Sequence, residues 1–153
     1  MQGIDLHNAT FAVQGFGKVG SEYAKLMSAA GARLIVLSNR TGAIANENGF
    51  DVDDLLRKRQ DGGDGFITRY SDGERISHPQ VLTAPVTVLL PAARAWAIDE
   101  NTYRDIEAQV IICAANVAMD DDVEWRLFEK GTVVVTDFVA IAEASSALFS
   151  SAT

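Results

Sequence analysis

The chain has 153 residues, of which 48% are hydrophobic and 22% charged, and these values are typical of one soluble globular domain covering residues 1–153. Its 13 basic and 21 acidic residues give a net charge of -8, which argues against nucleic acid and against an anionic membrane surface as partners. Residues 1–8 do not resemble a signal peptide, and no apolar run approaches the ~20 residues of a membrane span, so we expect a cytoplasmic protein.

The first third of the chain predicts a strand, a helix and a second strand. Residues 10–14 and 34–37 are apolar runs that predict the two strands. Between them, apolar residues recur at steps of three and four, which predicts a helix that ends at Gly31. The residues of this expected buried face are Val19, Tyr23, Leu26, Met27 and Ala30.

The middle of the chain is less regular. Residues 41–49 are rich in turn formers and suggest a small hairpin. Residues 51–59 predict a short helix with Asp51 as its N-cap, and residues 61–65 predict a flexible loop. Ser77 is a candidate cap for another short helical turn, with Pro79 near its start.

The last third returns to alternating strands and helices. Strands are predicted over residues 86–90, 110–113 and 132–136, and helices over residues 120–130 and 140–149. The alternation predicts an α/β fold of Rossmann type, in which a doubly wound, mostly parallel sheet carries helices on both faces.

A glycine pattern follows the first predicted strand directly. Gly15, Gly17 and Gly20 match the dinucleotide-binding pattern, and they lie between a strand and a helix, where phosphate binding requires them. Gly15 permits the tight turn, Gly17 lets the backbone approach a pyrophosphate, and Gly20 lets the helix pack closely on the strand. The loop also contains Phe16, Lys18 and Val19 as candidate cofactor contacts. The alternative is an ordinary strand–turn–helix with glycines for tightness, and with Lys18 as a solvated surface charge.

The end of the second strand predicts which dinucleotide binds. An acid about 20 residues after the glycines would bond the ribose 2′-OH of NAD, but this chain has Asn39 there, followed by Arg40 and Thr41. An amide does not repel a 2′-phosphate, a guanidinium binds one, and the hydroxyls of Ser38 and Thr41 are additional donors. We therefore expect NADP to be preferred over NAD. In the alternative interpretation, Asn39 opens a turn and Arg40 is a surface charge.

Six segments in order resemble the glutamate/leucine/phenylalanine/valine dehydrogenase family. The resemblance implies that the chain is the C-terminal NAD(P)-binding domain of an amino-acid dehydrogenase, which oxidatively deaminates an L-amino acid to a 2-oxo acid. It also implies that Ala92 and Ala93 pass the cofactor ribose and that Asn116 lies near the nicotinamide ribose. For Ala92 and Ala93 the alternative is small-residue packing, and for Asn116 it is a helix cap. The segments that carry the resemblance are residues 11–20, 38–44, 49–56, 90–93, 114–116 and 137–140.

The chain departs from this family at the nicotinamide end of the site. Cys113-Ala114-Ala115-Asn116 stands where the family has glutamate-glycine-alanine-asparagine. Residues 141–144 lack the family's asparagine and two glycines, and Leu148 replaces a common hydroxyl-bearing residue. Cys113, in an apolar run, is expected to be a buried thiol, and we expect no metal site.

The family's catalytic lysine and aspartate lie in a separate amino-acid-binding domain, which we expect to be supplied in cis or in trans because this chain begins at its first cofactor strand. None of the four lysines suits a catalytic base, so the catalytic residues are unknown from this sequence. A homo-oligomer is possible. One alternative function is a stand-alone NADP-binding sensor or interaction module, and another is a Rossmann protein that holds a different nucleotide. The lysines are Lys18, Lys25, Lys58 and Lys130.

Overall fold

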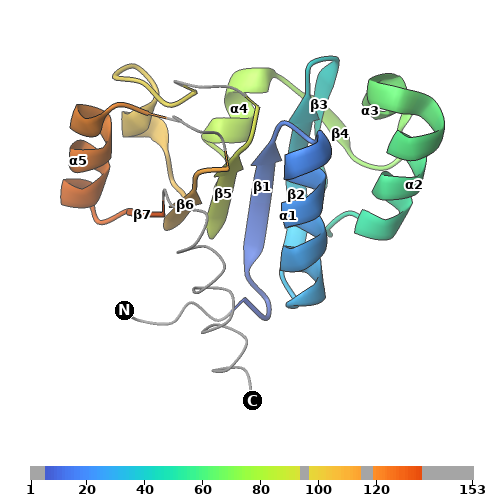
Figure 1. Ribbon diagram of the computed structural model, residues 1–153, viewed down its shortest axis with the longest axis horizontal. Helices are drawn as coiled ribbons and strands as arrows, with labels where there is room; N and C mark the ends of the chain where they lie inside the picture. The colour runs from blue at the N-terminus through green and yellow to red at the C-terminus, as the bar shows by residue number, and fades with distance from the viewer. Residues whose placement is uncertain (1–5, 94–96, 115–118, 136–153) are drawn as a thin grey trace.

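The sheet at the centre of the protein has seven strands, in the order β4-β3-β2-β1-β5-β6-β7 (Figure 1). The computed structural model describes residues 6–93, 97–114 and 119–135. Five neighbouring strands are parallel, and β3 and β4 are added antiparallel at one edge. The strands are β1 (Thr10–Gln14), β2 (Arg33–Asn39), β3 (Gly42–Ala45), β4 (Glu74–Ile76), β5 (Val88–Pro91), β6 (Val110–Ile112) and β7 (Val133–Val135).

Helices cover both faces of this sheet, which confirms the predicted Rossmann-type doubly wound α/β fold. One apolar core joins α1 and the α2–α3 region to one face of the sheet, and a second core joins α4 and α5 to the other. The helices are α1 (Lys18–Ala29), α2 (Val52–Gly62), α3 (Phe66–Arg69), α4 (His78–Leu82) and α5 (Asp121–Lys130), with 3-10 turns η1 (Gly63–Gly65) and η2 (Tyr103–Asp105).

Local sequence signals explain where several helices begin. Asp51 caps α2, since its carboxylate accepts a hydrogen bond from the Asp54 backbone N–H at 3.1 Å. Asp120 caps α5 in the same way. The Ser77 N–H donates to Gln80 Oε1 at 2.7 Å at the start of α4, where Pro79 occupies the first turn. These observations confirm the Asp51 and Ser77 predictions.

The structure corrects two details of the predicted elements. Residues 61–65 are not a flexible loop, because α2 continues to Gly62 and η1 follows it. Val19 and Leu26 were expected on the buried face of α1, but they are 48% and 54% exposed. Tyr23 and Met27 face inward as predicted, and Gly20 and Ala24 join them, because the side without a Cβ at Gly20 packs on the strand.

One hairpin, one strand and one helix complete the comparison between the predicted and the observed elements. A hairpin is present, but it joins β2 to β3, with Asn39 opposite Gly42, and does not lie within residues 41–49 as suggested. Strand β4 was not predicted, because its three residues are at least partly exposed and carry no apolar pattern. The helix predicted over residues 140–149 lies outside the described residues. Within the described part of the chain, no helix is long and apolar enough to cross a membrane.

The order of the strands defines where a ligand can bind. Strand β1 lies between β2 and β5, so the chain leaves β1 toward one side of the sheet and later crosses to the other. Open α/β sheets bind ligands at such a switch point, beyond the carboxyl ends of the strands. The glycine loop, the β2–β3 turn and the segment after β5 all begin at this edge (Figure 1).

Candidate functional site

The glycine loop is a tight turn held by the end of β2. The backbone N–H groups of Gly15 and Phe16 both donate to the Ser38 carbonyl oxygen, at 2.9 and 2.6 Å. Gly15 has a φ of +94°, which favours glycine. A Cβ at Gly15 would lie 2.7 Å from Ala93 Cα, so the loop also packs directly against the segment after β5.

Gly20 fixes the distance between α1 and this turn. A Cβ at Gly20 would lie only 2.1 Å from the Gly15 carbonyl oxygen and 3.1 Å from Val13 Cγ1. No side chain fits in that space, so the third glycine lets the first turn of α1 rest on the end of β1. This geometry agrees with the packing role expected from the pattern.

Gly17 leaves the N-terminus of α1 open. It is the N-cap residue, has an extended backbone and provides no side chain to cap the helix, and a Cβ built there would meet nothing within 4 Å. The first N–H groups of a helix have no intrahelical partner, so those of Lys18, Val19 and Gly20 remain for a ligand. The first turn contains no acidic residue. The arrangement is therefore suited to an anion such as a pyrophosphate.

Phe16 lies in the core rather than at the open side of the loop. Its side chain is fully buried, and its ring packs against Phe66 with 5.9 Å between centroids. Its N–H is already bonded to Ser38. Lys18 and Val19 are exposed beside the open end of α1. The structure thus assigns Phe16 a packing role and leaves its two neighbours accessible.

Asn39 ties the β2–β3 turn to η1. It is 8% exposed, and its amide Nδ2 donates to the Asp64 carbonyl oxygen at 2.7 Å. Its Oδ1 accepts from the Thr41 N–H at 2.8 Å and from the Thr41 hydroxyl at 2.7 Å. The Asn39 carbonyl oxygen lies 2.7 Å from His78 Nε2 on α4. Both ends of the Asn39 side chain are therefore used within the protein, as in the turn-opening interpretation.

Arg40 projects into solvent beside a carboxylate that sequence reasoning missed. Its side chain is 83% exposed, and its Nε lies 2.9 Å from Asp64 Oδ2. Asp64 is 24 residues further along the chain, in a glycine-rich stretch that gave no signal of a site. Ser38, by contrast, is buried and holds the glycine loop through its carbonyl oxygen. The charge of Arg40 is thus partly compensated where a 2′-phosphate was expected.

The other predicted site residues lie after β5 and β6. The Ala92 N–H donates to the Gln14 carbonyl oxygen at 2.7 Å, which continues the β1–β5 pairing, and Ala93 is exposed next to Gly15. Asn116 lies outside the described residues. Cys113, at the end of β6, is buried, and this burial raises the pKa of its thiol to about 11. It has the environment of a structural thiol, not of a nucleophile.

Three of the four lysines lie outside the glycine loop. Lys130 donates to the carbonyl oxygens of Ile106 at 2.6 Å and Arg104 at 3.0 Å, so it holds the segment around η2. Lys25 is exposed on α1, and Lys58 is exposed on α2. Among the described residues, no cluster of three or more His, Cys, Asp or Glu side chains could hold a metal ion.

A comparison with protein families decides the affiliation. Residues 1–143 match the family described as Glutamate/Leucine/Phenylalanine/Valine dehydrogenase. The chain belongs to this family. The match includes the glycine loop, the β2–β3 turn and all seven strands, so the resemblance noted in six separate segments extends over nearly all of the 153 residues.

Curated relatives in this family are longer proteins. The chain is 37% identical over 141 residues to a glutamate dehydrogenase of Thermotoga maritima, covering 92% of this chain and 33% of the relative. It is also 37% identical over 139 residues to an NADP-specific glutamate dehydrogenase A1 of Halobacterium salinarum, covering 90% of this chain and 33% of the relative. The chain therefore spans about a third of the length of these relatives.

Solved structures of this family share the fold. A hetero-hexameric glutamate dehydrogenase from Thermus thermophilus superposes with a TM-score of 0.77 at 29% identity, over 89% of this chain and 31% of that chain. A glutamate dehydrogenase from Plasmodium falciparum gives a TM-score of 0.75 at 16% identity, over 95% of this chain and 32% of that chain. The second likeness shows the fold alone.

Proposed function

We propose that residues 1–153 are the C-terminal NAD(P)-binding domain of an amino-acid dehydrogenase of the glutamate type. One observation supports this proposal most strongly. The N-terminus of α1 is open at Gly17, faces the switch point between β1 and β5, and follows a turn that only glycines can form at Gly15 and Gly20. This is the arrangement in which helix N-termini bind dinucleotide phosphates.

Each part of the site has a separate task in this proposal. The N–H groups of Lys18, Val19 and Gly20 receive the pyrophosphate, and the Lys18 ammonium adds positive charge nearby. Ala92 and Ala93 let the ribose approach the sheet without a large side chain in the way. Asn116 orients the nicotinamide ribose. The nicotinamide, when bound, supplies the carbon that accepts hydride, and the protein holds and shields it.

We also propose that the domain prefers NADP over NAD. The Asp64 carboxylate determines how large this preference is. Arg40 is exposed and keeps further N–H donors for a 2′-phosphate, while Asn39 contributes no charge. Asp64, 2.9 Å from Arg40, repels the same phosphate. The two effects oppose each other, so the expected preference for NADP over NAD is smaller than an unpaired arginine would produce. An NADP-specific enzyme among the relatives supports the direction.

The amino acid would be bound mainly by parts of the enzyme outside this chain. The relatives are three times longer, and no lysine in the described residues is placed as a base. We propose that the amino-acid-binding domain, joined in cis or in trans, supplies the catalytic groups for oxidative deamination to a 2-oxo acid. Assembly into an oligomer is part of the same proposal, and one structural relative is described as hetero-hexameric.

A spectrophotometric screen of amino acids with NAD and NADP tests the activity. We expect no turnover by the 153-residue chain alone and glutamate-type oxidation when the amino-acid-binding domain is present, in cis or in trans. Turnover by this chain alone would show that the catalytic groups have been misplaced.

A second candidate function is a stand-alone NADP-binding sensor or interaction module. The observation that favours it is the replacement of the family's polar and glycine residues within 141–144, a segment that the family resemblance associates with the nicotinamide end of the site. This candidate predicts dinucleotide binding without oxidation of any amino acid, even when an amino-acid-binding domain is present. The same screen therefore separates the two functions.

A further inference from the structure

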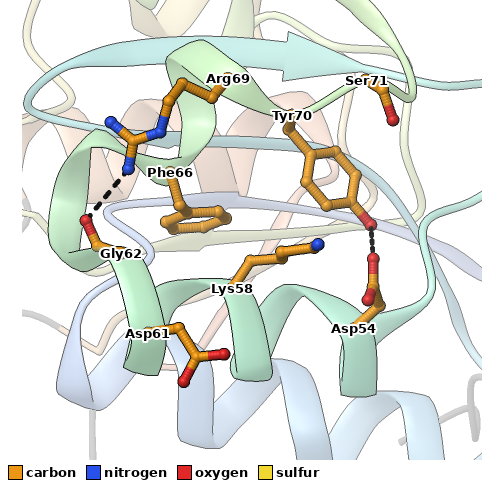
Figure 2. Close-up of a pocket in the computed structure, with 8 residues that line it drawn as sticks. All are labelled: Asp54, Lys58, Asp61, Gly62, Phe66, Arg69, Tyr70 and Ser71. Carbon is orange, nitrogen blue, oxygen red and sulfur yellow. Dashed lines mark hydrogen bonds between the residues drawn. The ribbon is translucent and has the colours of Figure 1, made fainter.

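A hollow lies between α2 and the α3 region, apart from the glycine loop (Figure 2). It encloses about 420 Å³ and is lined by Asp54, Lys58, Asp61, Gly62, Phe66, Arg69, Tyr70 and Ser71 (Figure 2). None of the candidate dinucleotide-binding residues lines it. Phe66 separates the two regions, since its ring contacts Phe16 on one side and Tyr70 on the other, at 5.9 and 6.4 Å between centroids.

Arg69 is held in place by two glycines that line or border this pocket. Its Nη2 donates to the Gly62 carbonyl oxygen at 3.3 Å. A Cβ at Gly62 would lie 2.8 Å from Arg69 Nη2, and one at Gly65 would lie 3.2 Å from Nη1. The guanidinium therefore lies against the backbone of Gly62 and Gly65. It carries five N–H donors, and one of them is bonded to Gly62.

Lys58 is the second cation of the pocket. In Figure 2 its side chain extends from α2 across the space between Phe66 and Tyr70. Within the described residues, neither Lys58 nor Arg69 forms an ion pair with a carboxylate. Two cations from facing elements thus border one pocket without an anionic partner.

Two carboxylates, those of Asp54 and Asp61, also line the pocket. Asp54 accepts the Tyr70 hydroxyl at 2.8 Å and lies 3.2 Å from Arg57 Nη2, so its own charge is compensated. Burial, together with this bond to Asp54, raises the pKa of Tyr70 above its usual value and keeps the phenol neutral. In Figure 2 the Asp61 carboxylate points away from the Phe66 ring.

We propose that this pocket binds a small dianion, a phosphate or a dicarboxylate, between Lys58 and Arg69. A point-charge ammonium and a forked guanidinium together match the oxygens of such a ligand. Gly62 and Asp64 belong to the same short segment, so the bound dianion lies next to the backbone that positions Arg40.

Titration of the ¹⁵N-labelled chain with sodium phosphate, and separately with sodium succinate, tests the proposal. Sodium chloride at matched ionic strength is the reference. At least one dianion should shift the amide resonances of Gly62, Gly65 and Ser71 with a saturable curve. Saturation by phosphate alone identifies an oxyanion site, and saturation by succinate alone identifies a dicarboxylate site. Changes that follow ionic strength only, or that are confined to the glycine loop, would overturn the proposal.

Two variants test whether the charges of Lys58 and Arg69 bind the dianion. Lys58→Gln and Arg69→Gln should each weaken dianion binding about tenfold, because each removes a charge-assisted hydrogen bond. Lys25→Gln makes the same charge change on the exposed side of α1 and should leave the affinity unchanged. Equal affinity in all three variants would contradict the proposal. Since no dinucleotide is present, the outcome does not depend on the proposed cofactor function.

Discussion

Arg40 and Asp64 form an ion pair, with 2.9 Å between Nε and Oδ2, at the carboxyl end of β2. Arg40 follows the strand whose end normally selects the dinucleotide, whereas Asp64 comes from η1. The carbonyl oxygen of Asp64 accepts the Asn39 amide at 2.7 Å and lies 3.0 Å from the Thr41 hydroxyl oxygen. The β2–β3 turn and η1 therefore form one unit, and a change in either should alter cofactor choice.

The Asp64→Asn variant should shift the preference toward NADP. The amide keeps the size of the side chain and leaves the backbone contacts of Asn39 intact, but it removes the charge that compensates Arg40. The affinity for NADP relative to NAD should rise about tenfold, the value of one well-formed charge-assisted hydrogen bond. Paired calorimetric titrations with both dinucleotides measure this ratio.

Arg40 provides the matching test in the opposite direction. Arg40→Ser should lower NADP affinity and leave NAD affinity nearly unchanged, because only the 2′-phosphate needs the guanidinium. The double variant Asn39→Asp with Arg40→Ser should favour NAD. If the parent chain prefers NAD and Arg40→Ser leaves the selectivity unchanged, then the Arg40 guanidinium contacts only solvent and Asp64, and does not bind the dinucleotide.

Gly20 should be far more sensitive to substitution than Gly17. A Cβ at Gly20 would lie 2.1 Å from the Gly15 carbonyl oxygen, whereas one at Gly17 would meet nothing within 4 Å. Gly20→Ala should therefore lower the free energy of unfolding by about 3 kcal/mol or more, since backbone must move. Gly17→Ser should be close to neutral, because serine is a good N-cap. Urea unfolding measures both, and equal stability of the two variants would refute the packing account.

The sequence was sufficient for the sheet and the glycine loop because both depend on local signals. Apolar runs predicted five of the strands, and the spacing of Gly15, Gly17 and Gly20 predicted a turn whose close contacts the structure shows. The pairing of Arg40 with Asp64 depends on how η1 folds back onto β2. No pattern in the sequence around either residue predicts that contact. Likewise, the face of α1 was misjudged, since periodicity does not show that Gly20 must lie innermost.

Asn39 should contribute to stability as well as to selectivity. It is 8% exposed and makes three side-chain hydrogen bonds, two to Thr41 in the turn and one to Asp64 in η1. Asn39→Ala should cost about 1–3 kcal/mol, because it removes all three bonds that join the turn to η1 and hold Thr41. Arg40→Ala, at an 83% exposed side chain, is the control and should change stability by less than about 1 kcal/mol. If both variants unfolded at the parent's urea midpoint, the turn would not depend on Asn39.

Cys113 should react slowly and should make stability fall at alkaline pH. Burial raises the pKa of its thiol from 9.0 to about 11, so folding favours the protonated form. The stability that this group contributes is fully present below pH 9 and is lost as the pH rises toward 11. Relative to the parent, Cys113→Ala should lose less stability between pH 8 and pH 10. A thiol reagent should label the native parent only after unfolding, and rapid labelling at neutral pH would contradict the buried placement.

The central claim is that the open N-terminus of α1 binds the pyrophosphate of a dinucleotide. Gly17→Val tests it most directly, because the structure leaves space for a side chain there while a bound pyrophosphate would need the same space. Calorimetry should show NADP binding by the parent chain and at least about a tenfold loss of affinity in the variant, with an unchanged circular dichroism spectrum. Equal NADP affinity in the folded variant, or no binding by the parent, would contradict the claim.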